Sequence, residues 1–297
     1  MDHYLSAVQR ALEFIEARLT EPITLAAIAR RAGFSPWHFQ RIFQAYMGET
    51  LAAYLRRRRL SVAVNEIRNT RRRILDIALD YQFGTHAAFT RAFKATFQAA
   101  PRTFRREHRP LPAALAQPVA SPPAGRYFPM KPTLRKLPAL TFIGLEARFF
   151  GPMSPDCNNH KVIPPLFNRF FARTSELPPG PEDACTYGLT RCAPAPDRIR
   201  DDELVYLAAR RAAPRTPVPA GMARWKLAAQ TYAVFTHCGP VVRVDDTFTR
   251  IYREWLPQSG HEPVGEGSLE CYEHTRFGDG GPKSEFDIFI PVRPRRK

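Results

Sequence analysis

Apolar residues recur at helical spacing through the first hundred positions of the chain. In residues 2–19 they stand three or four apart, which predicts an amphipathic helix; they are Leu5, Val8, Leu12, Ile15 and Leu19. The same criterion predicts helices over 25–32, 36–47, 51–68, 74–81 and 86–97, followed by a last short helix around Phe104. Gly33 supplies a tight turn, Ser35 and Pro36 offer a cap and a first-turn proline, and Gly48 ends a helix.

Two of these helices carry the same six-residue pattern. HFQRIF runs from His38 to Phe43 and AFTRAF from Ala88 to Phe93, so the copies are offset by 50 positions. In each copy two phenylalanines four apart share a helical face, and the arginine between them points away from it. A short helix, a break and a second helix with an outward polar face form a helix-turn-helix, whose second helix enters the major groove of DNA. A generic helical repeat is the alternative, because it would also pair phenylalanines at this spacing.

The helix predicted over residues 51–68 would join the two units. Its eighteen residues would span about 27 Å, which suits two reading helices about 34 Å apart, one turn of DNA. A single chain could then occupy two successive major grooves. Arg56–Arg59 surround this helix, so phosphate contact and a solvated charged face remain equally open readings for each of them.

The distribution of charge supports a polyanionic partner for the first third of the chain. The whole sequence has a formal net charge of +16. Residues 1–110 hold 19 Lys and Arg against 9 Asp and Glu, a net +10, and the rest of the chain carries +6. A basic excess concentrated in one region is typical of nucleic-acid binding. General arginine richness is the competing explanation, and it would raise the charge of both parts.

Residues 5–107 resemble the DNA-binding domain of the AraC/XylS family, and especially its MarA/SoxS/Rob subgroup. The fragments SPWHFQRIF, AAYLRRRRLS and ILDIALDYQF carry the resemblance. It implies a double helix-turn-helix that contacts promoter DNA and RNA polymerase. The sequence departs from the subgroup at His86–Ala87, where a pair of glutamines is usual, so we expect a different second half-site. The expected DNA readers are Trp37, Gln40 and Arg41 in one groove, and His86, Thr90 and Arg91 in the next.

The pattern changes after a segment rich in proline and alanine. Residues 108–130 contain six prolines, which is typical of a linker. We therefore expect a DNA-binding domain at 1–107, a linker at 108–130 and a second domain at 131–297.

The second domain contains an internal repeat. KLPALTFIGLE (136–146) aligns with KLAAQTYAVFT (226–236) at an offset of 90 positions. Each run reads as a strand and precedes one helical stretch and two further strands. The helices are expected over 162–174 and 246–256, and the strands over 185–192, 203–210, 268–275 and 285–292. The expected fold is thus an all-α domain of two helix-turn-helix units joined by a long helix, followed by an α+β domain with a duplicated β-α-β-β unit. Duplicated units usually pack about a pseudo-twofold axis with a cleft between them.

This second domain resembles the GyrI-like effector-binding domains over roughly residues 128–294. The fragments YAVFTHCGP, IYREWLP, SLECYEH and FDIFIPV carry the resemblance. It implies that a small, often cationic or aromatic molecule binds between the two halves. Some members of the family instead hydrolyse strained electrophilic compounds.

Glu270 is the residue on which the ligand hypothesis depends. In the family pattern the glutamate of SLECYEH faces the cleft. A carboxylate in an aromatic cavity would attract a cation, and burial would raise its pKa when the cavity is empty. A surface position for Glu270 and ordinary core packing for the aromatics are the alternatives. The expected aromatic walls are Tyr187, Tyr206, Trp225, Trp255 and Tyr272, with Tyr232 as a further candidate.

Several other chemistries are not indicated by the sequence. The five cysteines form no Cys-x-x-Cys pair and the eight histidines have no metal-ligand spacing. We find no glycine-rich phosphate loop and no catalytic triad, so we expect no metal and no cofactor. The N-terminus lacks an apolar secretory core, and no apolar run reaches the ~20 residues of a membrane span. We expect a cytoplasmic, nucleoid-associated protein.

The leading hypothesis is a ligand-responsive transcription regulator, with activation favoured and a multidrug or stress response implied by the subgroup. It would bind promoter DNA as a monomer and sense a small molecule with its second domain. The first alternative is an enzyme in which Glu270 acts as a general base on a strained electrophile. The second is an architectural DNA-binding protein whose C-terminal domain binds nothing.

Overall fold

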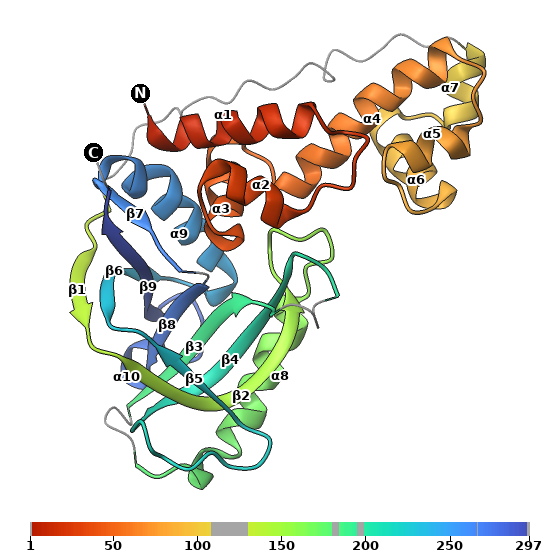
Figure 1. Cartoon of the computed structure of the whole chain (residues 1–297). Coiled ribbons are helices and arrows are strands. Elements are labelled where there is room, and N and C mark those ends of the chain that lie inside the picture. Colours follow the sequence, from red (N-terminus) through yellow and green to blue (C-terminus); the bar gives the residue numbers. More distant parts are fainter. Residues whose placement is uncertain (1, 108–129, 180–183, 195–198, 266, 296–297) are drawn as a thin grey trace.

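The computed structural model describes residues 2–107, 130–179, 184–194, 199–265 and 267–295. The expected linker lies outside these residues except for Met130. The N-terminal region is helical, and Figure 1 shows α1–α3 beside the sheet while α5–α7 lie beyond the far end of α4. Its helices are α1 (His3–Glu16), α2 (Leu25–Ala32), α3 (Pro36–Met47), α4 (Leu51–Asn69), α5 (Ile74–Asp80), α6 (His86–Phe97) and α7 (Pro101–Glu107).

Local chemistry fixes where these helices begin and end. The side chains of Thr24, Thr50 and Thr85 each accept a hydrogen bond from the amide three residues later, which caps α2, α4 and α6. Gly33 ends α2 in the left-handed conformation, with φ of 90°. The Ser35 side chain makes no capping hydrogen bond for α3, contrary to the sequence expectation.

The paired phenylalanines are buried in both helix-turn-helix units, as the repeat predicts. Phe39 and Phe43 of α3, and Phe89 and Phe93 of α6, have no exposed surface. The surroundings of the two pairs differ. The α6 pair packs in a core formed by α4–α7, whereas the α3 pair belongs to an apolar cluster that continues into the C-terminal domain.

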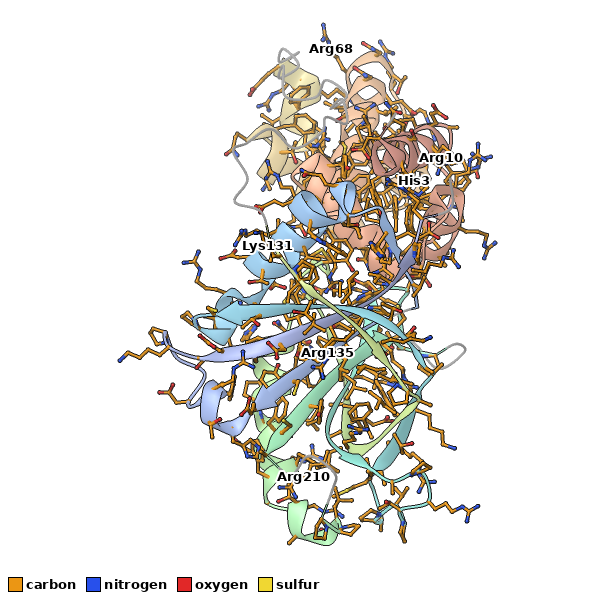
Figure 2. All side chains as sticks on the ribbon, turned by 90° about the vertical axis from the view of Figure 1, so that its left-hand side faces the viewer. His3, Arg10, Arg68, Lys131, Arg135 and Arg210 are labelled. Carbon is orange, nitrogen blue, oxygen red and sulfur yellow. The ribbon has the colours of Figure 1, made fainter. Side chains whose placement is uncertain are left out.

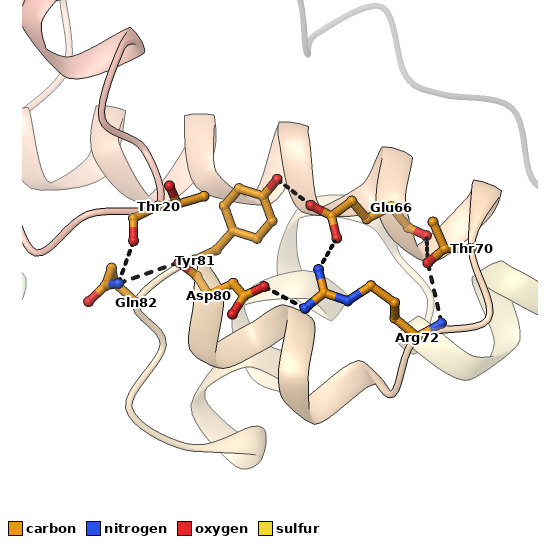
Figure 3. A network of polar contacts seen from close by, with 7 residues as sticks. All are labelled: Thr20, Glu66, Thr70, Arg72, Asp80, Tyr81 and Gln82. Atoms are coloured by element: carbon orange, nitrogen blue, oxygen red, sulfur yellow. Dashed lines mark hydrogen bonds and ion pairs between the residues drawn. The ribbon is translucent and has the colours of Figure 1, made fainter.

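A polar network holds the second unit on α4 (Figure 3). Tyr81 donates a hydrogen bond of 2.8 Å to one carboxylate oxygen of Glu66, and Arg72 donates one of 2.7 Å to the other. Arg72 also pairs with Asp80 of α5 at 2.5 Å. Gln82 donates a hydrogen bond of 2.6 Å to the backbone carbonyl of Thr20. These contacts fix the connection from which α6 starts.

The C-terminal domain is built on one nine-stranded sheet with the order β1-β6-β9-β8-β3-β4-β2-β5, and β7 pairs with β9. All the pairings are antiparallel. The strands are β1 (Thr133–Leu137), β2 (Leu140–Phe150), β3 (Cys185–Cys192), β4 (Glu203–Ala212), β5 (Ala223–Leu227), β6 (Gln230–Cys238), β7 (His261–Pro263), β8 (Gly267–Glu273) and β9 (Glu285–Pro294). The helices are α8 (Asn159–Phe171), α9 (Val244–Arg250) and the short α10 (His274–Phe277), and a π-helical turn, η4 (Ile251–Trp255), continues α9.

The register of the outer strands confirms the internal repeat. Lys136 of β1 pairs with Thr231 of β6, and Lys226 of β5 pairs with Thr141 of β2. Lys226 corresponds to Lys136, and Thr231 to Thr141, at the offset of 90 positions. Each half therefore gives its first strand to the other half. Each aligned run holds two strands, whereas the sequence pattern predicted one. In the first run the break falls at Pro138, which cannot donate a ladder hydrogen bond.

The two domains lie end to end. Figure 2 shows Arg68 of α4 at the free end of the helical part and Arg210 of β4 toward the opposite end of the molecule. Where they meet, α3 contacts α9, η4 and β3. This contact brings the first expected reading helix to the second domain.

Candidate functional site

Of the two helices expected to read DNA, α6 is the exposed one. His86 and Arg91 are exposed on it, while Thr90 is half-buried and its enclosed hydroxyl oxygen has no hydrogen-bond partner among the described residues. A shallow basic cavity adjoins His86. Its arginines are Arg71, Arg72, Arg73, Arg102, Arg105 and Arg106. Such a rim suits phosphate contacts beside a reading helix, where lysine and arginine fix the position of a protein on DNA. None of these six arginines is among the DNA readers expected from the sequence.

The other reading helix, α3, has its polar face covered. Trp37, Gln40 and Arg41 are only 3%, 8% and 8% exposed. As expected DNA readers these three side chains should be exposed to solvent, and in this arrangement of the domains they are buried. The polar face of a short helix is normally the solvated one, but here it packs against α9, η4 and β3. In this arrangement the three side chains cannot reach a DNA groove.

Arg41 is held mainly by aromatic rings. Its guanidinium lies 3.7 Å from the centre of the Trp37 ring and 4.9 Å from that of Phe248 on α9. Its one hydrogen bond among the described residues is long, 3.4 Å from Nη1 to the carbonyl of Trp37, and Nε has no partner there. Burial lowers the pKa of Arg41. Cation–π attraction therefore replaces much of the hydration that this charge loses.

His38 fastens α3 to the second domain by two hydrogen bonds. Its Nε2 lies 2.9 Å from the carbonyl oxygen of Val264, and its Nδ1 lies 2.6 Å from the hydroxyl of Tyr252. A carbonyl oxygen only accepts, so Nε2 carries the proton, and Nδ1 accepts from Tyr252 in the neutral ring. Burial lowers the pKa of His38 to about 4. The docked arrangement thus favours neutral His38.

Glu270 lines a cavity of about 280 Å³. One of its carboxylate oxygens accepts hydrogen bonds from Tyr206 at 2.9 Å and from Tyr272 at 2.6 Å. Gly188, opposite Glu270 on β3, leaves room for this group, because a Cβ there would lie 1.8 Å from the Tyr206 hydroxyl. Burial raises the pKa of Glu270, while the two tyrosine hydrogen bonds oppose that rise. The site thus contains a buried carboxylate that accepts hydrogen bonds from two tyrosine hydroxyl groups.

Three of the expected aromatic walls lie away from this cavity. Tyr187 pairs with Cys271 rather than Glu270, so strand alternation places it on the other face of the sheet. Trp225 lies in the core on that face, with the Arg191 guanidinium 3.8 Å from its ring centre. Trp255 stacks on His261 and meets Phe235 edge-on. The expectation that Tyr187, Trp225 and Trp255 surround Glu270 is therefore not met, and Tyr232 lines a separate cavity beside Trp225.

The residues that complete the Glu270 cavity were not identified from the sequence. Asp245 and Phe248 of α9 line it, as do Trp37 and Arg41 of α3. Burial raises the pKa of Asp245, and the Arg41 charge lowers it. The adjacent acids in VVRVDDTF were a visible signal for Asp245. The sequence does not indicate that α3 contributes to this cavity, because a contact between domains produces no local periodicity.

A larger and more open groove of about 890 Å³ lies elsewhere between the domains. Its charged lining includes Arg30, Arg191, Arg293 and Glu262. It contains no buried acid and few aromatic rings, so the smaller Glu270 cavity is the better candidate for a small-molecule site. Within the described ranges, no cluster of three or more His, Cys, Asp or Glu could hold a metal ion. No helix of the described part combines the length and apolar character that membrane crossing requires.

Two helix-turn-helix units followed by a duplicated sheet with an enclosed acid define a class, the transcription regulators that join a DNA-binding region to a small-molecule-binding domain. Residues 130–293 match the family of the GyrI-like small molecule binding domain, and the chain belongs to it. Residues 28–107 match a helix-turn-helix domain of the AraC type.

Two curated relatives align with this chain over nearly its whole length, and shorter relatives match about a third of it. Transcriptional regulator Rob of Salmonella typhimurium and the right origin-binding protein of Escherichia coli K12 are each 28% identical over 302 residues, covering 96% of this chain and 98% of each relative. The regulatory protein SoxS of Salmonella typhimurium is 35% identical over 98 residues, 33% of this chain and 92% of its own length. A solved structure of SAV2435 bound to tetraphenylphosphonium matches with a TM-score of 0.42 at 20% identity, covering 55% of this chain and 94% of that one. The two matched domains together give the chain a Rob-like architecture.

Proposed function

We propose that this chain is a transcription activator controlled by a small lipophilic cation that binds at Glu270. The observation that carries the proposal is the enclosed carboxylate, which faces a cavity lined by Tyr206, Tyr272 and Phe248. A buried acid costs free energy when it is ionised without a partner, and a cation restores that loss. Aromatic rings add cation–π attraction.

The DNA partner is proposed to be a promoter with two half-sites. Support comes from the helix-turn-helix match, the basic rim beside His86 and the exposed Arg91. The proposed base readers remain Trp37, Gln40 and Arg41 for one half-site, and His86, Thr90 and Arg91 for the other. Contact with RNA polymerase, which activation requires, is proposed from the likeness to named transcription regulators.

The effector is tested by calorimetric titration of the full chain with tetraphenylphosphonium, an aromatic cation. We expect saturable binding that Glu270→Gln weakens at least tenfold, because the substitution removes the charge and keeps the shape. Glu273→Gln is the matched control, since it makes the same charge change on β8 three residues away, on the opposite face. Equal binding by all three proteins, or no binding by any, would remove the effector site.

The same preparation tests the enzymatic alternative. Incubation with a strained electrophile such as an epoxide should leave the compound intact apart from its spontaneous hydrolysis. Catalysed turnover that disappears in Glu270→Gln would assign Glu270 as a general base instead.

A further inference from the structure

The effector cavity has a wall that comes from the DNA-binding domain. Trp37 and Arg41 of α3 line it together with Glu270 and Asp245. The cavity therefore depends on how the domains are docked. Its volume of about 280 Å³ is just below the roughly 300–1,000 Å³ usual for drug-sized ligands. Withdrawal of α3 would enlarge it.

Arg41 has the properties expected of the ligand itself. It is a cation, it lies against two aromatic rings, and its charge acts on both Asp245 and Glu270. Its hydrogen bonding is poor for a buried guanidinium, with one long bond to Trp37 and an enclosed Nε that has no partner among the described residues. A buried cation that is incompletely hydrogen-bonded is readily replaced, since its release recovers hydration.

We propose that α3 is a self-ligand of the effector domain, in which Arg41 occupies the cation site until a lipophilic cation displaces it and frees α3 for DNA. This inference rests on the proposed function. The docked state holds the reading face of α3 closed while α6 stays exposed. The free chain then reads one half-site, and the cation-bound chain reads two. The effector is therefore an inducer of DNA binding.

The two uses of α3 exclude each other. Trp37, Gln40 and Arg41 cannot lie against α9 and also in a major groove. When two ligands favour the same open state, each raises the affinity for the other by the same factor. Operator DNA and the cation must then promote each other's binding reciprocally.

The first experiment measures this reciprocity with the full chain. The probes are tetraphenylphosphonium and a duplex selected by the chain from random DNA in its presence. We expect saturating tetraphenylphosphonium to tighten duplex binding at least fivefold, and the duplex to tighten tetraphenylphosphonium binding by the same factor. A second duplex, scrambled in the half-site assigned to α3, should show no coupling. Unchanged or weakened duplex affinity on cation binding would overturn the inference.

A second experiment opens the interface without touching any proposed reader. Tyr252→Phe removes the hydroxyl group that donates a hydrogen bond to His38 in the docked state. We expect it to tighten the intact duplex about tenfold without cation and to shrink the effect of tetraphenylphosphonium, because docking loses a buried hydrogen bond. Tyr232→Phe is the matched control, since it loses one hydrogen bond with Gln230 on a strand away from α3.

The outcomes separate this inference from the function on which it rests. Absence of tetraphenylphosphonium binding would refute the effector site itself. If both probes bind without affecting each other, and Tyr252→Phe leaves duplex affinity unchanged, the proposed function stands. The proposal that α3 is a self-ligand is then overturned.

Discussion

The two reading helices carry one sequence pattern and have opposite environments. In α3 nine of twelve residues are buried, and in α6 three of twelve are buried. The difference comes from the partner of each outer face: α3 meets α9 and η4, whereas α6 keeps His86 and Arg91 exposed. A duplicated helix-turn-helix unit can thus have one copy exposed to solvent and the other packed against a second domain.

The largest expected effect comes from Phe248, which packs on Arg41 and belongs to the core shared by the two domains. Phe248→Ala should remove about 3–5 kcal/mol of packing free energy. Part of this loss should lower the free energy of unfolding of the second domain, and the rest should weaken the docking of α3. We expect operator binding to become insensitive to cation while binding through α6 is retained. Calorimetric unfolding measures the first share and duplex titration the second. Full retention of the cation effect would show that α9 does not hold α3.

The next effect compares the two arginines. Arg91→Ala should weaken the operator complex by about 1–3 kcal/mol with or without tetraphenylphosphonium, because α6 is free in both states. Arg41→Ala should cause a similar loss only when the cation is present, since without it α3 contributes little. Arg215→Ala, an exposed loop arginine, controls for net charge. Equal losses for Arg41→Ala in both conditions would contradict the docked state.

The acid dependence of docking gives a smaller effect. The pKa of His38 is about 4 when docked and should return to its ordinary value of 6.5 when α3 is released. Docking is then fully stable above about pH 6.5 and weakens as the pH falls toward 4. Tyr252 and Arg41 are the ionisable groups that face the ring. At pH 5.5 docking should be about tenfold weaker than at pH 7.5, or 1.4 kcal/mol. The solvent protection of Trp37, measured at pH 5.5 and pH 7.5, reports this difference in docking. His38→Gln should abolish the difference between the two pH values.

The smallest expected effect concerns the attachment of α6. Tyr81→Phe removes a hydrogen bond to Glu66 and should lower the free energy of unfolding by about 1 kcal/mol. The same change should slightly weaken the half-site read by α6 and leave tetraphenylphosphonium binding intact. Thermal unfolding and duplex titration measure the two quantities. A change in cation binding would mean that the two units are coupled through α4.

Much of the fold followed from local pattern. The phenylalanine pairs at an offset of 50 predicted both helix-turn-helix cores, Gly33 and Gly48 predicted helix ends, and the offset of 90 predicted the duplicated sheet. Glu270 and Tyr272 share a strand face because they are two residues apart, and both reach the cavity.

The rest required non-local information. Tyr187 is placed away from Glu270 by the pairing register of β3 with β8, which the sequence of either strand does not encode by itself. Trp37 and Arg41 have the polar-face spacing of solvent-exposed readers, and only the packing of a distant helix makes them buried. The acid of the site, Glu270, could therefore be predicted from a sequence motif. The wall that α3 contributes could be found only from the tertiary structure.

The reading face of α3 is proposed to be closed in the free chain and opened by a cation. Hydroxyl-radical footprinting of the unmodified chain, read by mass spectrometry, measures the solvent accessibility of Trp37 directly. Oxidation of Trp37 should be slow in the free chain and rise severalfold with saturating tetraphenylphosphonium, while the equally buried Trp225, at 5% exposed against 3%, stays constant as the internal reference. Rapid oxidation of Trp37 in the free chain, or protection that the cation leaves unchanged, would contradict the claim.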